Sequence, residues 1–169
     1  MACPNHLRRD PFIELTAPKV PRLAHRNLEP DDAALLIAAC IDSTERLVVI
    51  LGLQLGLRRA EISLLEVGDL RLRAGEVLVH GKGGHADTIP LTEHATLAVK
   101  AYMADKAITA GPLLRGVANP AVGKSPESVG RIFADVAYRA GLKRQPHDGV
   151  STHALRHTAA TDVYRRTKD

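Results

Sequence analysis

Four side chains from separate stretches of the sequence are of the types that hold a phosphodiester and move protons around it: Arg58, Lys82, His153 and Arg156. A guanidinium fork donates two parallel hydrogen bonds to two non-bridging phosphate oxygens. Two arginines can therefore clamp one phosphodiester and stabilise the charge of a five-coordinate transition state. An imidazole suits proton transfer near neutral pH, and an ammonium can donate a proton to a leaving oxygen.

Each of these residues also has a simpler interpretation. Arg58 and Glu61 have the i, i+3 spacing of a structural ion pair. Lys82 lies among glycines at 81–84 and could be a solvated turn lysine. His153 could cap a helix or fill the core. His157 has metal-pair spacing with it, but no Cys or Glu ligand accompanies the two, so zinc is not predicted.

The glycines around Lys82 do not form a nucleotide-binding phosphate loop. The stretch at 81–84 lacks the Gly-x-x-x-x-Gly-Lys-Ser/Thr spacing, and it joins two expected strands instead of a strand and a helix. The hypothesis of a phosphodiester site therefore depends on the co-occurrence of the four residues.

Composition is compatible with one domain that binds a polyanion. The 169 residues are 45% hydrophobic and only 3% aromatic, with no Trp, which argues against binding single strands by base stacking. The net charge is +4, and residues 113–169 carry 10 Lys and Arg against 5 Asp and Glu. This basic third would attract a phosphate backbone, although any single cation in it is more simply a solvated surface group.

The chain start and the cysteines set the expected organisation. Four prolines within residues 1–27 predict a flexible tail or linker, followed by a domain over residues 28–169. Cys3 and Cys40 have no metal-site spacing, and we interpret both as reduced thiols of a cytoplasmic protein. No stretch is long and apolar enough to span a membrane, and none resembles a signal peptide.

The pattern along the chain predicts an α+β fold that is mainly helical. Helices are expected at about 28–40, 46–57, 59–65, 92–107 and 126–140, with a last one from 151 or 152. Candidate caps are Asp42 or Ser43 for the second helix, Thr92 for the fourth and Ser125 for the fifth. The helix at 46–57 is apolar all round and should be buried. Short strands at 67–72, 76–79 and 86–90 predict a three-stranded antiparallel meander, with Lys82 at its second turn.

Three ordered motifs in this frame resemble those of the tyrosine recombinases, also called the phage integrase family. They are Gly-Leu-Arg-Arg-Ala-Glu at 56–61, Gly-Lys-Gly-Gly at 81–84 with Ile-Pro-Leu at 89–91, and His-Ala-Leu-Arg-His-Thr at 153–158. The resemblance covers about residues 27–161. It implies a catalytic domain for site-specific recombination, with a small sheet that grips duplex DNA.

The resemblance also implies a role for each matching residue. Arg58 and Arg156 would hold the scissile phosphate, and Glu61 would brace Arg58. Lys82 would be the general acid toward the 5′ leaving oxygen. His153 would assist proton transfer, with His157 as a supporting neighbour. Such enzymes need neither metal nor cofactor, because a phosphotyrosyl link conserves the bond energy.

Further DNA contacts are expected from cations outside these motif roles. Arg59, Lys124 and Arg131 are candidates for contacts to the phosphate backbone. The partner implied by the resemblance is duplex DNA, on which several copies would assemble through segments absent from this sequence.

The tyrosines depart from the family pattern, in which the nucleophile lies on a helix well beyond the His/Arg motif. Tyr164 is the only tyrosine after Arg156. Eight residues along one helix place it about 12 Å away along the axis and turn it by about 80°. Tyr102 and Tyr138 precede the motif and look like packing residues. The sequence therefore predicts a catalytic domain that is incomplete at its carboxyl end and lacks the nucleophile.

Two alternatives remain open from the sequence. One is a relic or regulator that binds recombination sites without cutting DNA. The other is an unrelated helical domain that binds a protein and carries these motifs by coincidence.

Overall fold

The computed structural model describes residues 28–81, 83–146 and 149–167, and the side chains of all of these except 30 and 162–167. The tail expected over residues 1–27 lies outside these ranges, so its flexibility and the domain boundary after it stay predictions. Leu28 is buried, and its backbone N–H donates to Thr158 Oγ1 at 3.2 Å. The packed part of the molecule thus includes the first described residue.

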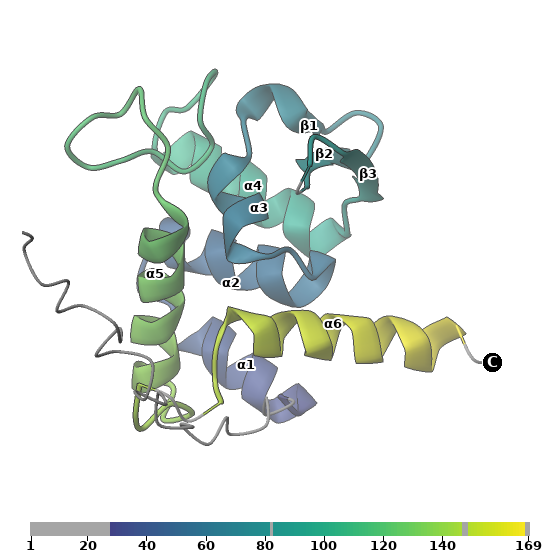
Figure 1. Ribbon diagram of the computed structural model, residues 1–169, viewed down its shortest axis with the longest axis vertical. Helices are drawn as coiled ribbons and strands as arrows, with labels where there is room; N and C mark the ends of the chain where they lie inside the picture. The colour runs from purple at the N-terminus through teal and green to yellow at the C-terminus, as the bar shows by residue number, and fades with distance from the viewer. Residues whose placement is uncertain (1–27, 82, 147–148, 168–169) are drawn as a thin grey trace, which may run out of the picture.

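Helices dominate the described part of the chain, as the sequence predicted (Figure 1). Their bounds are α1 Pro30–Ala38, α2 Ser43–Leu55, α3 Arg59–Leu64, α4 Glu93–Asp105, α5 Pro126–Arg139 and α6 Thr152–Thr167. Three of them begin at side-chain caps: Asp42 for α2, Thr92 for α4 and Ser125 for α5. None of the helices in the described ranges is long and apolar enough to cross a membrane.

The buried helix predicted from its apolar run is α2, which forms the centre of the fold. It packs against α4, α5 and α6, and every residue from Leu47 to Leu53 is buried. Because this helix contacts elements on several sides, an apolar side chain is favoured at almost every position.

The small sheet is a three-stranded antiparallel meander in the order β1-β2-β3. The strands are β1 Leu70–Arg71, β2 Glu76–His80 and β3 Ala86–Pro90, and Leu78 pairs with Thr88 in the centre of the β2–β3 hairpin. The mainly helical α+β fold predicted from the sequence is confirmed.

The first strand was predicted too long. A strand was expected over residues 67–72, but Val67–Asp69 forms a 3₁₀ turn and only Leu70–Arg71 pairs with β2. Asp69 explains the difference, since its carboxylate accepts from the Glu66 backbone N–H at 2.9 Å and lies 3.0 Å from His80 Nε2. A short polar side chain bonded to nearby backbone competes with strand pairing.

Candidate active site

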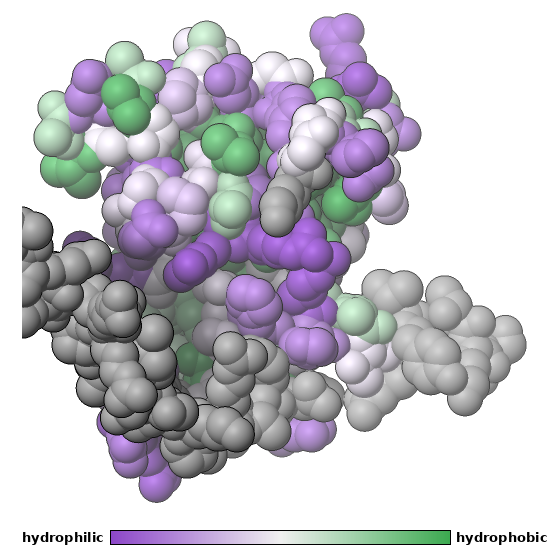
Figure 2. Space-filling model, viewed as in Figure 1, coloured by the Kyte–Doolittle hydropathy of each residue, from purple (hydrophilic) through white to green (hydrophobic). Residues whose placement is uncertain are grey.

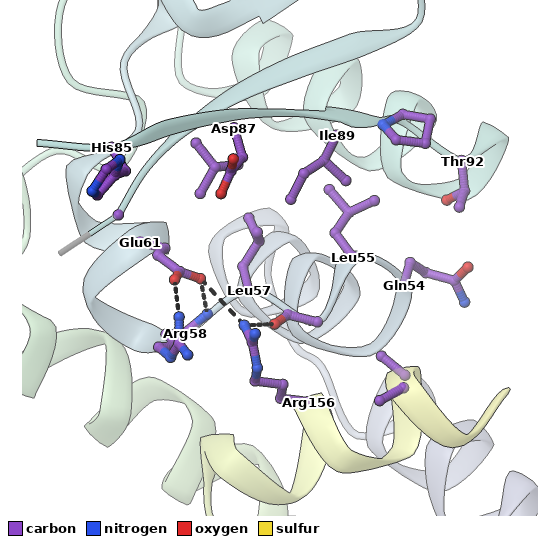
Figure 3. A pocket seen from close by; sticks show the side chains of 16 residues that line it. Gln54, Leu55, Leu57, Arg58, Glu61, His85, Asp87, Ile89, Thr92 and Arg156 are labelled. Atoms are coloured by element: carbon purple, nitrogen blue, oxygen red, sulfur yellow. Dashed lines mark hydrogen bonds and ion pairs between the residues drawn. The ribbon is translucent and has the colours of Figure 1, made fainter. Parts of the chain in front are cut away.

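A pocket of about 830 Å³ opens where α2 ends, between α3, the β2–β3 hairpin and α6 (Figure 3). Its lining includes Arg58, Glu61 and Arg156, which the sequence analysis placed in one site. Figure 2 shows hydrophilic side chains gathered across the middle of the same face of the molecule, between the sheet and α6. The structure therefore brings all three motifs to one pocket, since Gly81, Ile89 and Pro90 of the middle motif also line it and the first and last motifs are about 100 residues apart in the sequence.

Arg58 is positioned by the junction between α2 and α3. Gly56 ends α2 with φ 62 and ψ 27, a left-handed conformation that favours glycine. Arg58 then precedes α3 in extended conformation, and its backbone N–H donates to Glu61 Oε2 at 2.7 Å. The Arg58 side chain also donates from Nη1 to Glu61 Oε1 at 2.6 Å. Glu61 thus caps its own helix and fixes the guanidinium group beside it.

Arg156 reaches the same carboxylate from α6. Its Nη1 donates to the Gly56 carbonyl oxygen at 2.9 Å and lies 3.7 Å from Glu61 Oε2. A Cβ atom on Gly56 would lie 3.3 Å from Ala159 Cβ and 3.7 Å from Arg156 Cγ. Glycine at position 56 therefore serves two purposes, since it permits the left-handed turn and lets α6 approach closely.

Glu61 is much more buried than the two arginines that it holds in place. The Glu61 side chain is only 10% exposed, whereas those of Arg58 and Arg156 are 54% and 44% exposed. The buried carboxylate reduces the repulsion between the two guanidinium groups and leaves part of each facing the pocket. The structural ion pair of Arg58 and its role in a site are thus compatible. Two forks on one side of a pocket are suited to binding one phosphodiester.

The other predicted catalytic residues are not among the described residues that line the pocket. Lys82 lies outside the described residues, although its neighbour Gly81 lines the pocket. His153 and His157 are exposed on α6, and neither belongs to the lining formed by the described residues. Their roles in proton transfer and support stay predictions.

The three additional cations lie elsewhere. Arg59 crosses α5, with Nη1 3.6 Å from the point where a Cβ atom on Gly130 would stand. Arg131 is exposed on α5, and Lys124 is partly buried in the preceding loop, where its backbone N–H donates to Leu114 O at 2.8 Å. They are not part of the pocket, and their contact with DNA stays a prediction.

Four polar residues of the pocket were not expected from the sequence: Gln54, His85, Asp87 and Thr92. The sequence patterns around some of these residues could have indicated their place in a pocket. Gln54 is the only polar residue between Leu47 and Leu57. The alternation of residues 85, 87 and 89 along a predicted strand places their side chains on one face. His85, Asp87 and Ile89 indeed line the pocket together (Figure 3).

Comparison with known proteins identifies the family of the chain and supports its fold. The sequence profile of the phage integrase family matches residues 26–169. The chain is 34% identical over 166 residues to the tyrosine recombinase XerD of Caulobacter vibrioides, covering 91% of this chain and 53% of the relative. The chain belongs to the phage integrase family, whose members include tyrosine recombinases. It spans about half the length of the curated relatives that it matches.

Solved structures support the fold independently. The XerA recombinase superposes with a TM-score of 0.74 at 24% identity, over 87% of this chain and 53% of that one. The XerH site-specific recombinase, solved in a pre-cleavage complex with its difH substrate, superposes with a TM-score of 0.68 at 18% identity, over 89% of this chain and 47% of that one. The described helices and meander thus have the architecture of these recombinases.

Proposed function

We propose that this chain is a catalytic portion of a site-specific DNA recombinase, which binds duplex DNA and holds the reacting phosphodiester between Arg58 and Arg156. The observation that supports this most is the sharing of one buried carboxylate, Glu61, by two half-exposed guanidinium groups in a single pocket. The names of the relatives agree with it, since they are tyrosine recombinases and one solved neighbour is bound to its DNA substrate.

In the proposed reaction a tyrosine oxygen attacks the phosphorus atom, and the bond from phosphorus to the 5′ oxygen breaks. Arg58 and Arg156 stabilise the negative charge on the non-bridging oxygens in the transition state. Lys82 donates a proton to the departing 5′ oxygen, and His153 assists the transfer of the proton that the attacking tyrosine hydroxyl loses. Glu61 acts through the arginines as a positioning residue.

We do not assign the nucleophile to Tyr164. It belongs to α6, which continues without a break from Thr152 to Thr167. A separation of eight helical residues corresponds to about 12 Å along the axis from Arg156. This position favours a second candidate function for the chain by itself, namely duplex binding without strand cleavage. A covalent adduct between the chain and a nicked duplex that disappears in Tyr164→Phe would support cleavage through Tyr164 and reject this second candidate.

The proposed function also bears on where the protein acts and on how many copies act together. Action in the cytoplasm is compatible with the proposed duplex substrate. Assembly of several copies on DNA follows from the exchange of strands, which requires a reacting phosphodiester in each of the two sites that exchange.

The test is duplex binding by the wild-type chain and by the double variant Arg58→Ala, Arg156→Ala. Hydrogen bonds to a charged group contribute about 1.5–3 kcal/mol each, so we expect affinity to fall at least about tenfold. The matched control is Arg46→Ala, Lys100→Ala, which removes two exposed charges outside the pocket and should change affinity much less. Equal losses in both double variants would reject the proposed site.

A further inference from the structure

The β3 wall of the pocket carries a carboxylate that the proposed phosphate clamp does not use. Asp87 pairs with Val79 through the hairpin backbone, and its side chain faces the pocket between those of His85 and Ile89 (Figure 3). It is exposed, and it lies across the pocket from the side occupied by Arg58 and Arg156.

The two arginines are already engaged by the other carboxylate. Glu61 lies 2.6 Å from Arg58 Nη1 and 3.7 Å from Arg156 Nη1. Within the described residues, the Asp87 carboxylate has no side-chain hydrogen bond or ion pair. It therefore presents acceptor oxygens to whatever enters the pocket.

A phosphodiester cannot satisfy this group. An ionised carboxylate only accepts hydrogen bonds, and phosphate oxygens also only accept them. A phosphate placed at the arginines would instead be repelled by Asp87, so the carboxylate favours a different part of the ligand. The hydrogen-bond donors on the base edges of duplex DNA are exocyclic amino groups, those of adenine and cytosine in the major groove and that of guanine in the minor groove. Thymine has no such amino group.

We propose that Asp87 is a specificity-determining residue, which accepts a hydrogen bond from the amino group of a base adjacent to the phosphodiester held by Arg58 and Arg156. This inference rests on the proposed function, because it requires duplex DNA in the pocket. It assigns the arginine side of the pocket to the backbone and the β3 side to a base edge. Contacts of the first kind position the duplex, and contacts of the second kind read its sequence.

The experiment is selection of bound duplexes from a random-sequence library, followed by sequencing. For the wild-type chain we expect enrichment at one position of one strand, of adenine and cytosine if the contact lies in the major groove or of guanine if it lies in the minor groove, with thymine depleted in both cases. Asp87→Ala removes the acceptor and should reduce discrimination at that position by about fivefold or more, the effect of one good base contact, and leave other positions unchanged. Asp87→Asn, which keeps the side-chain size and adds a donor, should change the preferred base at the same position.

The control Asp135→Ala removes an exposed carboxylate from α5, outside the pocket, and should leave the sequence profile unchanged. A uniform gain in affinity for all sequences in Asp87→Ala, with unchanged preferences, would overturn the inference and make Asp87 a purely electrostatic group. The double variant Arg58→Ala, Arg156→Ala is selected in parallel. If it loses binding while Asp87→Ala keeps the wild-type profile, only the inference fails; if it binds like the wild type, the proposed function fails as well.

Discussion

At the scale of single residues, the arrangement of the site depends on Glu61. Its carboxylate accepts from the Arg58 backbone, pairs with the Arg58 side chain and approaches Arg156. Such a buried acceptor is costly to remove, since the groups bonded to it lose their partner inside a partly desolvated site. The sequence could predict the pair of Arg58 and Glu61 from their spacing, but not the third contact, which comes from a helix about 100 residues away.

We therefore expect Glu61→Ala to lower the free energy of unfolding by about 1–3 kcal/mol, through loss of the helix cap and of the hydrogen bonds to Arg58. Glu61→Gln keeps an acceptor for the Arg58 N–H and should cost less. Urea unfolding measures both. Glu66→Ala, which changes an exposed glutamate, should stay within about 0.5 kcal/mol of the wild type. Equal stability of Glu61→Ala and Glu66→Ala would contradict the bracing role.

A second residue-scale prediction concerns Cys40. Burial, with Glu45 nearby, raises the pKa of the Cys40 thiol to about 11. The thiol also donates to the Leu36 carbonyl oxygen at 3.2 Å. Because the thiolate is the reactive form, Cys40 should be alkylated slowly at pH 8 in the native state and quickly in denaturant. Iodoacetamide labelling of the Cys3→Ser variant measures this, and fast native labelling would be the contrary result.

At the scale of elements, the close packing of α2 on α6 places Arg156 beside the end of α2. Gly52 allows this approach, because a Cβ atom there would lie 2.5 Å from Leu155 Cδ1 and 3.3 Å from Leu155 Cβ. Leu155 is itself buried and has little room to move. Gly52 lies one helical turn before Gly56. The close approach at Gly52 therefore brings α6 near enough for Arg156 to donate a hydrogen bond to the Gly56 carbonyl oxygen.

Gly52→Ala should therefore destabilise the fold by about 1–2 kcal/mol, because overpacking outweighs the gain in helix propensity of about 1 kcal/mol. Gly68→Ala is the control, since nothing lies within 4 Å of its added Cβ atom. Urea unfolding compares the two variants. A stabilised Gly52→Ala would show that α2 and α6 can separate at no cost.

The elements themselves were largely predictable from the sequence. Apolar periodicity and caps such as Asp42, Thr92 and Ser125 are local signals, and the helices that they predict are present. The error at β1 arose because Asp69 accepts a hydrogen bond from the nearby Glu66 backbone, and its second contact, with His80, lies beyond the range of a local pattern.

At the scale of the whole molecule, the fold brings the first and last motifs to one pocket. The resemblance to a family predicted this convergence, whereas spacing and composition alone did not. The contribution of His85 and Asp87 to the pocket was not predicted, because the middle motif covers residues 81–84 and 89–91 and not the positions between them. Asp87 becomes notable only when the pocket shows which charges it faces.

The most direct test of the account is the slope of log Kobs against log salt concentration for duplex binding by four proteins: wild type, Arg58→Ala, Arg156→Ala and the double variant. One neutralised phosphate contributes about 0.9 to the slope for duplex DNA. If both arginines hold the same phosphate, each single variant should lose less than this amount and the double variant about 0.9. A loss of about 0.9 in each single variant and about 1.8 in the double variant would mean two separate phosphates. That result, or an unchanged slope in the double variant, would contradict the shared clamp.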